Sequence, residues 1–195
     1  MGSQVVDRAF REQSETDDAE LMLKIQQEDE RAFRELLNRY LVPLNRFAVR
    51  MLGNSHDAED LVQEAFLRAW KNAHQWQPHQ GKLTTWLHAI TRNLCIDFHR
   101  RDKSALHTEV SAQLQSSDTP EKYLAAANKG RAVTAALVQL PERQKSAIIL
   151  CHYQGLSNRD AAAVIGVSVD ALESLMARGR RTLRKDLASL SAQEE

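Results

Sequence analysis

The chain lacks the features that mark secreted, fibrous and membrane proteins. Its 195 residues hold two cysteines, Cys95 and Cys151, too few for a disulfide scaffold and suited to a reducing compartment. Four prolines and seven glycines provide few breaks of the kind that bound strands, so we expect an all-α fold. No apolar run approaches the roughly 18 residues of a membrane span, and the amino terminus has no apolar signal-peptide core. We therefore expect a cytoplasmic globular protein.

The chain also lacks net charge, because 26 basic residues balance 26 acidic ones. The charge is unevenly distributed: residues 1–30 carry a net charge of −6, residues 31–105 of +5, residues 106–130 of −1 and residues 131–195 of +2. Phosphate binding depends on the local charge, so two basic segments balanced by an acidic arm remain compatible with DNA binding. The overall neutrality indicates modest DNA affinity and a need for a partner.

The most informative segment, Leu156 to Lys185, has the spacing of a helix-turn-helix. Ala162 provides the small side chain that two crossing helices need, and Gly166 stands where the first helix must end with positive φ. Ser168 can then cap the second helix with its hydroxyl, and Leu172 with Leu175 or Met176 would pack it back on the first. Such a unit places its second helix in the DNA major groove, which makes an ordinary helical hairpin the weaker interpretation.

A second pattern, DAEDLVQEAFLRAW from Asp57 to Trp70, combines an apolar stripe with an acidic outer face. From spacing alone this face would be a solvated helix surface. The carboxylates do not indicate acid–base catalysis, because no set of Ser, Cys or His nucleophiles accompanies them.

A third pattern, from Lys82 to Lys103, predicts a helix with two different sides. Apolar residues recur on the side expected to face a core. The other side carries donors and cations at three- and four-residue steps: Thr85, His88, Arg92, His99 and Lys103, with Arg100 and Arg101 beside them. Together with Trp76 in the preceding loop, these residues suit phosphate contact and the support of unstacked bases. A basic helix exposed only to solvent is an equally balanced alternative.

Between these patterns the sequence predicts a simple helical order. Helices are expected to about Gln27, from Glu30 to Leu52 with a kink or break near Leu41 before Pro43, and from Ser55 to about Ala73. A long helix to about Arg101 closes a first domain, and residues 105–128 are rich in Ser, Gln, Thr and Asp, as in a flexible tether. Helices resume near Arg131, break at Leu140-Pro141 and continue to Tyr153. The predicted fold is two small helical domains joined by a flexible linker, the second containing the helix-turn-helix.

As a set, these residues resemble the extracytoplasmic-function class of sigma factors in the sigma-70 family. The resemblance divides the chain into an acidic arm (1–17), sigma region 2 (18–104), a linker (105–128), sigma region 4 (129–190) and a tail (191–195). It implies an alternative sigma factor that binds core RNA polymerase and directs promoter-specific transcription initiation, with no catalytic residues, cofactor, metal or small-molecule substrate of its own. It also implies control by an anti-sigma factor, as in stress responses. The expected location is cytoplasmic, and a membrane-anchored anti-sigma factor would hold the protein at the inner membrane face.

The resemblance assigns roles residue by residue. The core-polymerase-binding residues would be Asp57, Asp60, Gln63, Glu64 and Leu67. The minus-ten element would be read and melted by Trp76, Thr85, His88, Arg92, Asn93, Arg100 and Arg101. The minus-thirty-five element would be read by Ser168, Asp170, Ala171, Ser174, Arg178 and Arg181. The chain departs from the family pattern at Glu173 and Leu175, where Lys and Arg are frequent, and at Leu83, where an aromatic residue is common.

Two other interpretations remain open from the sequence. A helix-turn-helix regulator that binds operators without polymerase would explain Leu156–Lys185 but not the acidic face or the basic helix. A metal-responsive interaction module could use Cys95 with His99, four residues apart, or Cys151 with His152. Neither pair has the further closely spaced ligands of a structural zinc site, so we expect no metal.

Overall fold

The computed structural model describes residues 17–105 and 133–191, and all regular structure in these ranges is helical. The first half comprises a helix over residues 17–26, then α2 (Glu30–Leu52), α3 (Ser55–Lys71), two short 3-10 turns, η1 (Ala73–Gln75) and η2 (Pro78–Gln80), and α4 (Leu83–Ala105). The predicted all-α fold is confirmed. The acidic arm and the predicted linker lie outside the described residues, except Asp17 and Ala105.

The apolar periodicity of the first half builds one core. Fully buried side chains come from every long helix of this half: Met22, Leu36, Leu44, Phe47, Met51, Val62, Leu83, Leu87 and Leu94. Phe33 of α2 joins this core to α3 by edge-on contacts with Phe66 and Trp70, at ring-centroid distances of 6.5 and 4.8 Å. The predicted inward stripe of α3 is confirmed by the burial of Ala58, Val62, Ala65, Phe66 and Ala69.

Pro43 does not break α2, so of the kink or break predicted near Leu41 the break does not occur. The helix continues from Glu30 to Leu52 with Pro43 inside it. Leu44, Phe47 and Ala48, on the following turn, are all completely buried. Burial of these side chains stabilises the helix beyond the proline, which removes only one backbone donor.

The second half contains a helix over residues 133–139, α6 (Glu142–Ile148), a π-helical turn η3 (Ile149–Tyr153), α7 (Asn158–Ile165) and α8 (Val169–Ser191). The sequence predicted an unbroken helix to Tyr153, but its last five residues wind as a π-helix, in which Gln154 N donates to Ile149 O at 3.0 Å. π-helical turns occur mostly as single turns within α-helices, and they are frequent at functional sites.

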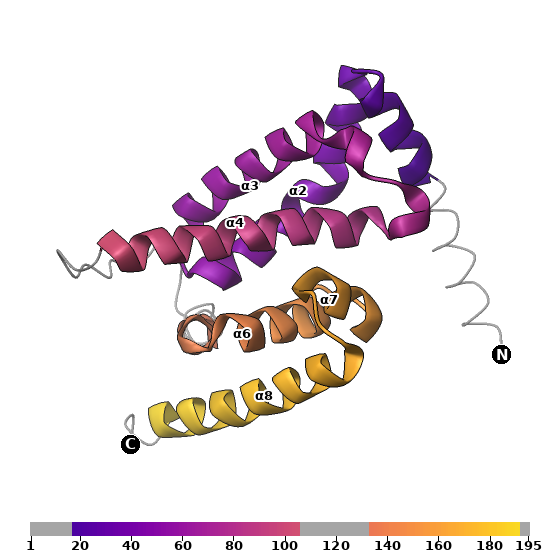
Figure 1. Cartoon of the computed structure of the whole chain (residues 1–195). Helices are drawn as coiled ribbons and strands as arrows, with labels where there is room; N and C mark the ends of the chain where they lie inside the picture. The colour runs from indigo at the N-terminus through magenta and orange to yellow at the C-terminus, as the bar shows by residue number, and fades with distance from the viewer. Residues whose placement is uncertain (1–16, 106–132, 192–195) are drawn as a thin grey trace, which may run out of the picture.

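The two halves lie against each other rather than apart. In Figure 1, α4 lies between the α2–α3 pair and the second half, with α7 and α6 along its other side. Contacts join α4 to α7 and α2 to η3, and the buried apolar cluster runs continuously through both halves. The sequence predicted both domains but gave no indication of this interface.

None of the helices described in residues 17–105 and 133–191 combines the length and apolar character that a membrane span requires.

Candidate nucleic-acid and polymerase interfaces

The helix-turn-helix has the local geometry that its residues predict. Ser157 caps α7, its Oγ accepting from Asp160 N at 3.1 Å. Gly166 ends α7 with φ of 74°, and the backbone N–H groups of Gly166 and Val167 both donate to Ala162 O, at 2.9 and 3.1 Å. The pair of hydrogen bonds to Ala162 O requires a left-handed backbone conformation at residue 166, which glycine adopts without a Cβ clash.

The second helix, α8, begins at the predicted cap and packs through the predicted positions. Ser168 Oγ accepts from Ala171 N at 3.2 Å. Leu172 is fully buried and Met176 is 7% exposed, whereas Leu175 is half-buried. The same register turns the proposed minus-thirty-five readers outward: Ser168, Asp170, Ser174, Arg178 and Arg181 are exposed and Ala171 is half-buried. This outward face of α8, which the sequence predicts as the recognition face, is therefore exposed.

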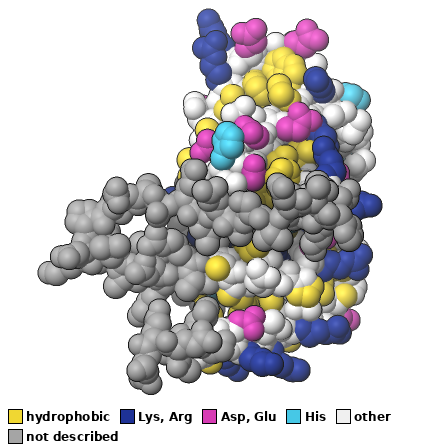
Figure 2. Space-filling model, turned by 90° about the vertical axis from the view of Figure 1, so that its left-hand side faces the viewer, with side chains coloured by type: hydrophobic (Ala, Val, Ile, Leu, Met, Phe, Trp, Pro, Cys, Tyr) yellow, Lys and Arg dark blue, Asp and Glu magenta, His cyan; other side chains and the backbone are white. Residues whose placement is uncertain are grey.

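The acidic face of α3 is also open. Asp60, Gln63 and Leu67 are exposed, and Leu67 retains 51% of its accessible surface. Glu64 Oε1 pairs with Arg68 Nε at 2.8 Å, and Asp57 Oδ2 accepts from Asn54 Nδ2 at 2.8 Å in the first turn. Figure 2 shows acidic side chains among exposed hydrophobic ones on the half of the molecule that contains α2 to α4, and Lys and Arg side chains along the lower edge, where α8 lies.

Trp76 is directed into the protein rather than outward. The Trp76 residue is only 6% exposed, and its carbonyl, with that of Ala73, accepts from Gln26 Nε2 at 3.4 and 3.0 Å. The loop between α3 and α4 is thus anchored on the helix over residues 17–26. In this position Trp76 can support the loop but cannot stack on a base.

The predicted reading side of α4 is divided between open and covered residues. Asn93, Arg100 and Arg101 are exposed, and Arg100 Nη1 lies 3.8 Å from Asp97 Oδ1 in a long ion pair. Thr85 is half-buried. His88 is 1% exposed and Arg92 is 7% exposed. On α4 the structure therefore leaves Asn93, Arg100 and Arg101 accessible and Thr85 partly so, whereas His88 and Arg92 are covered.

The second half of the chain covers His88 and Arg92. Arg92 Nε donates to Ser146 Oγ of α6 at 3.1 Å, and the side chain of Gln154, at the end of η3, approaches His88. His88 also bonds Thr84 O through Nδ1 at 2.7 Å and meets the Phe47 ring edge-on. Burial lowers the pKa of His88 below its ordinary value, despite the opposing hydrogen bonds to Thr84 and Gln154.

Sequence reasoning missed Lys145 and Ser146, which lie in this interface. Lys145 is 2% exposed although it is charged. Its position in the sequence indicated this burial. Lys145 lies three residues before Ile148 and four before Ile149, on the apolar stripe of its helix, where a lysine is unusual.

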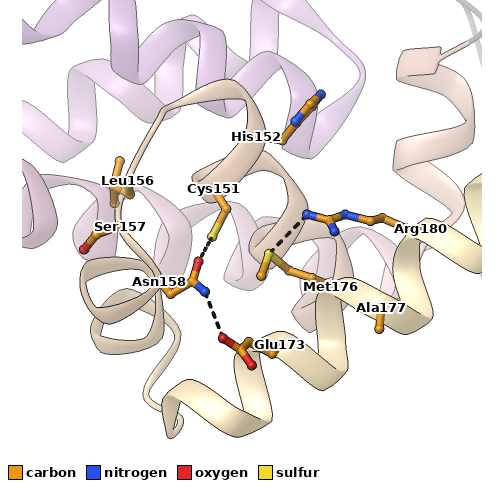
Figure 3. Close-up of a pocket in the computed structure, with 9 residues that line it drawn as sticks. All are labelled: Cys151, His152, Leu156, Ser157, Asn158, Glu173, Met176, Ala177 and Arg180. Carbon is orange, nitrogen blue, oxygen red and sulfur yellow. Dashed lines mark hydrogen bonds between the residues drawn. The ribbon is translucent and has the colours of Figure 1, made fainter.

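The two Cys–His pairs considered as metal ligands, Cys95 with His99 and Cys151 with His152, have different surroundings in the structure. Cys95 is fully buried, which raises its pKa to about 12, and His99 Nε2 bonds Met51 O at 3.1 Å. Cys151 and His152 line a cavity of about 510 Å³ between η3, α7 and α8, shown in Figure 3. Across it, Asn158 Nδ2 donates to Glu173 Oε1 at 3.1 Å and ties α7 to α8. Within residues 17–105 and 133–191 no group of three or more metal-type ligands comes together.

Comparison with known proteins matches both halves of the chain to one family. Residues 36–105 match Sigma-70 region 2, and residues 130–183 match Sigma-70, region 4. The ECF RNA polymerase sigma factor SigM of Mycobacterium tuberculosis is 32% identical over 177 residues, covering 91% of this chain and 88% of SigM. SigW of Bacillus subtilis is 28% identical over 187 residues, covering 88% of this chain and all of SigW. SigE of Mycolicibacterium smegmatis is 36% identical over 163 residues, or 82% of this chain, which spans only 63% of that longer relative.

Solved structures agree with this match. CnrH in complex with the cytosolic domain of CnrY aligns with a TM-score of 0.68 at 26% identity, over 88% of this chain and 97% of that one. The sigma factor RpoE of Bartonella quintana, in complex with the anti-sigma factor NepR, aligns with a TM-score of 0.65 at 28% identity, over 80% of this chain and 96% of that one. The chain belongs to the extracytoplasmic-function sigma factors of the sigma-70 family.

Proposed function

We propose that this sigma factor docks on core RNA polymerase through the outer face of α3 and reads promoters through α4 and α8. The observation that carries the proposal is the arrangement of three distinct helix faces, one acidic with an exposed leucine and two with cations and donors, on one chain of the family. The chain itself catalyses no reaction in this proposal, because transcription is the chemistry of the polymerase.

The polymerase-binding face comprises Asp57, Asp60, Gln63, Glu64 and Leu67. The open acidic side chains around Leu67 support this assignment, because an exposed apolar side chain ringed by charge suits a specific protein contact. The charges would set the orientation and speed of docking, and burial of Leu67 would stabilise the complex.

The promoter-binding faces comprise the two sets named from the sequence. For the minus-thirty-five element these are Ser168, Asp170, Ala171, Ser174, Arg178 and Arg181, and for the minus-ten element Thr85, His88, Arg92, Asn93, Arg100 and Arg101, with Trp76 supporting the preceding loop from within the protein. The exposure of α8 and of Arg100 and Arg101 supports contact with DNA phosphates and bases. Melting needs no covalent chemistry, because holding unstacked bases offsets an unstacking cost of order a few kcal/mol per base.

The proposal includes control by an anti-sigma factor, supported by the similarity to RpoE, which was solved with NepR. It also includes a cytoplasmic location, where polymerase and chromosome meet. Capture at the inner membrane face would follow if the anti-sigma factor were anchored there.

The α3 assignment is tested by reversing its charge. Asp60→Lys with Glu64→Lys should abolish co-elution with core polymerase and transcription initiation, because two repulsive charges would enter the centre of the contact. Circular dichroism should remain unchanged, because both side chains lie on the surface.

A matched control is Glu28→Lys with Glu35→Lys, because both residues lie outside α3. It changes the net charge equally and likewise breaks one ion pair across a helical turn, Glu35 with Arg39 at 2.8 Å. Full polymerase binding by the control and none by the α3 variant supports the assignment. Initiation by the α3 variant at the wild-type level would contradict it without affecting family membership.

A further inference from the structure

The first two turns of α8 carry acidic residues but no cation. From Val169 to Ala177 the sequence has Asp170 and Glu173 and neither Lys nor Arg, whereas five basic residues follow between residues 178 and 185. In a helix-turn-helix, the amino-terminal residues of the second helix are the ones that reach base edges. The end of α8 that would enter a DNA groove therefore presents negative charge, which the DNA phosphates repel.

The two acidic side chains have different surroundings. Glu173 Oε1 accepts from Asn158 Nδ2 at 3.1 Å, so this carboxylate is held against the start of α7, among the residues that line the cavity in Figure 3. Asp170 is exposed, and within residues 17–105 and 133–191 no hydrogen bond or ion pair involves its carboxylate. Of the two carboxylates, that of Asp170 is the one free to accept a hydrogen bond from a ligand.

Asp170 lies on the outward face of α8. It precedes Ser174 by four residues and Arg178 by eight, so these three exposed side chains follow one another along one side of the helix. Leu172 and Met176 are buried on the opposite side. A helix that enters the major groove by its outward face brings the Asp170 carboxylate to the base edges, and it brings Arg178, about 12 Å further along the axis, to the DNA backbone.

The major-groove edges of the four bases differ in what they offer a carboxylate, which can only accept hydrogen bonds. Guanine presents the acceptors N7 and O6, and thymine presents the O4 acceptor and a methyl group, so neither offers a donor. Adenine presents a donor at N6 beside the N7 acceptor, which repels a carboxylate. Cytosine presents its N4 amino group with no acceptor beside it. The Asp170 carboxylate is therefore complementary to cytosine.

We propose that Asp170 determines base specificity at the minus-thirty-five element by accepting a hydrogen bond from the N4 amino group of a cytosine in the major groove. This inference rests on the proposed role of α8. The contact with cytosine offsets the repulsion between the carboxylate and the neighbouring phosphates. With any other base at that position the repulsion remains, so Asp170 both favours cytosine and disfavours its competitors.

The preference is measured with the holoenzyme, assembled from core polymerase and the full chain, on promoter duplexes randomised across the minus-thirty-five region. Bound DNA is sequenced for the wild type and for each variant. The wild type should favour cytosine at one position of one strand by at least about fivefold over each other base, the lower end of what one mismatched base pair costs.

Substitution of Asp170 identifies that position and changes its preference. Asp170→Ala removes the acceptor and should reduce the preference for cytosine to less than about twofold. Asp170→Asn keeps the shape without the charge, and its amide is complementary to N6 and N7 of adenine, so the preferred base should change from cytosine to adenine. Preferences at the other positions should stay as in the wild type, because Asp170 is exposed and packs against no core residue.

Glu173→Gln is the matched control. It removes the same charge one turn further along α8, so it should strengthen binding to every sequence. It should keep the cytosine preference, because the Glu173 side chain is held against α7. If both Asp170 variants strengthen binding to every sequence as Glu173→Gln does, with all base preferences unchanged, Asp170 acts only as a charge at the end of the helix and the inference is overturned.

The same experiment separates this inference from the proposed function. A wild-type holoenzyme that enriches no sequence in the randomised region would contradict the proposed role of α8. Enrichment of an element whose base preferences are identical in the wild type and in both Asp170 variants would contradict only the assignment of Asp170.

Discussion

The two helices proposed to read DNA, α4 and α8, differ in what surrounds them. The recognition face of α8 is open, with Arg178 and Arg181 exposed, whereas His88 and Arg92 of α4 lie beneath the second half of the chain. Both helices have 23 residues and an amphipathic pattern. The difference therefore arises from the interface between the halves, and it teaches that a DNA-binding pattern in a sequence does not imply an available DNA-binding surface.

The largest expected effect tests whether the two halves are stabilised together. Leu172→Ala should lower the free energy of unfolding by about 3 kcal/mol, because it removes a fully buried side chain between α7 and α8. Since one buried cluster runs through both halves, thermal unfolding followed by circular dichroism should remain a single transition at lower temperature. Leu36→Ala, in the first half, should shift the same transition. Two separate transitions in either variant would show that the halves unfold independently.

The next effect concerns the pH dependence of the covered helix. Burial lowers the folded-state pKa of His88 below 6.5, so only the unfolded chain takes up a proton as the pH falls just below that value. The contribution of neutral His88 to stability is thus complete above pH 6.5 and is lost toward lower pH, by up to about 1.4 kcal/mol per pH unit. This contribution is measured by urea unfolding of the wild type and the His88→Gln variant between pH 7.5 and 5. A difference between the two that does not vary with pH would contradict the assignment.

The smallest effect concerns the open helix. Arg178→Ala should leave the unfolding free energy unchanged within about 0.5 kcal/mol, because the side chain is exposed. It should reduce the slope of log binding constant against log salt by about one for a promoter duplex, as expected for one lost phosphate contact. Arg92→Ala provides the contrast, because it should also weaken the interface between the two halves. An unchanged salt slope would remove Arg178 from the DNA interface.

Much of the local structure was predictable because it depends on neighbouring residues. Gly166 ends α7 with positive φ and Ser168 caps α8, as their spacing predicted. The outward orientation of the residues that the resemblance assigns to the minus-thirty-five element was likewise predictable, because Leu172 and Met176 determine which side of α8 turns inward. These features follow from backbone sterics and helical periodicity alone.

Other features were not predictable, because they depend on contacts distant in the sequence. Of the kink or break expected near Leu41, the break did not form, because packing of Leu44 and Phe47 outweighs the lost donor of Pro43. The burial of Trp76 depends on Gln26, fifty residues earlier in the chain. The tether prediction for residues 105–128 falls mostly outside the described residues and left open how the halves meet.

The sequence by itself determined the helical class and the helix ends, because composition, periodicity and capping act over a few residues. Its resemblance to the family predicted two domains and the faces that we propose bind polymerase and DNA. Only the tertiary structure decided which of those faces is accessible. Lys145 and the Met51 carbonyl are 94 residues apart, and nothing local requires them to meet. They meet because the apolar surfaces of both halves are buried together, which places a second-domain lysine at the end of a first-domain helix.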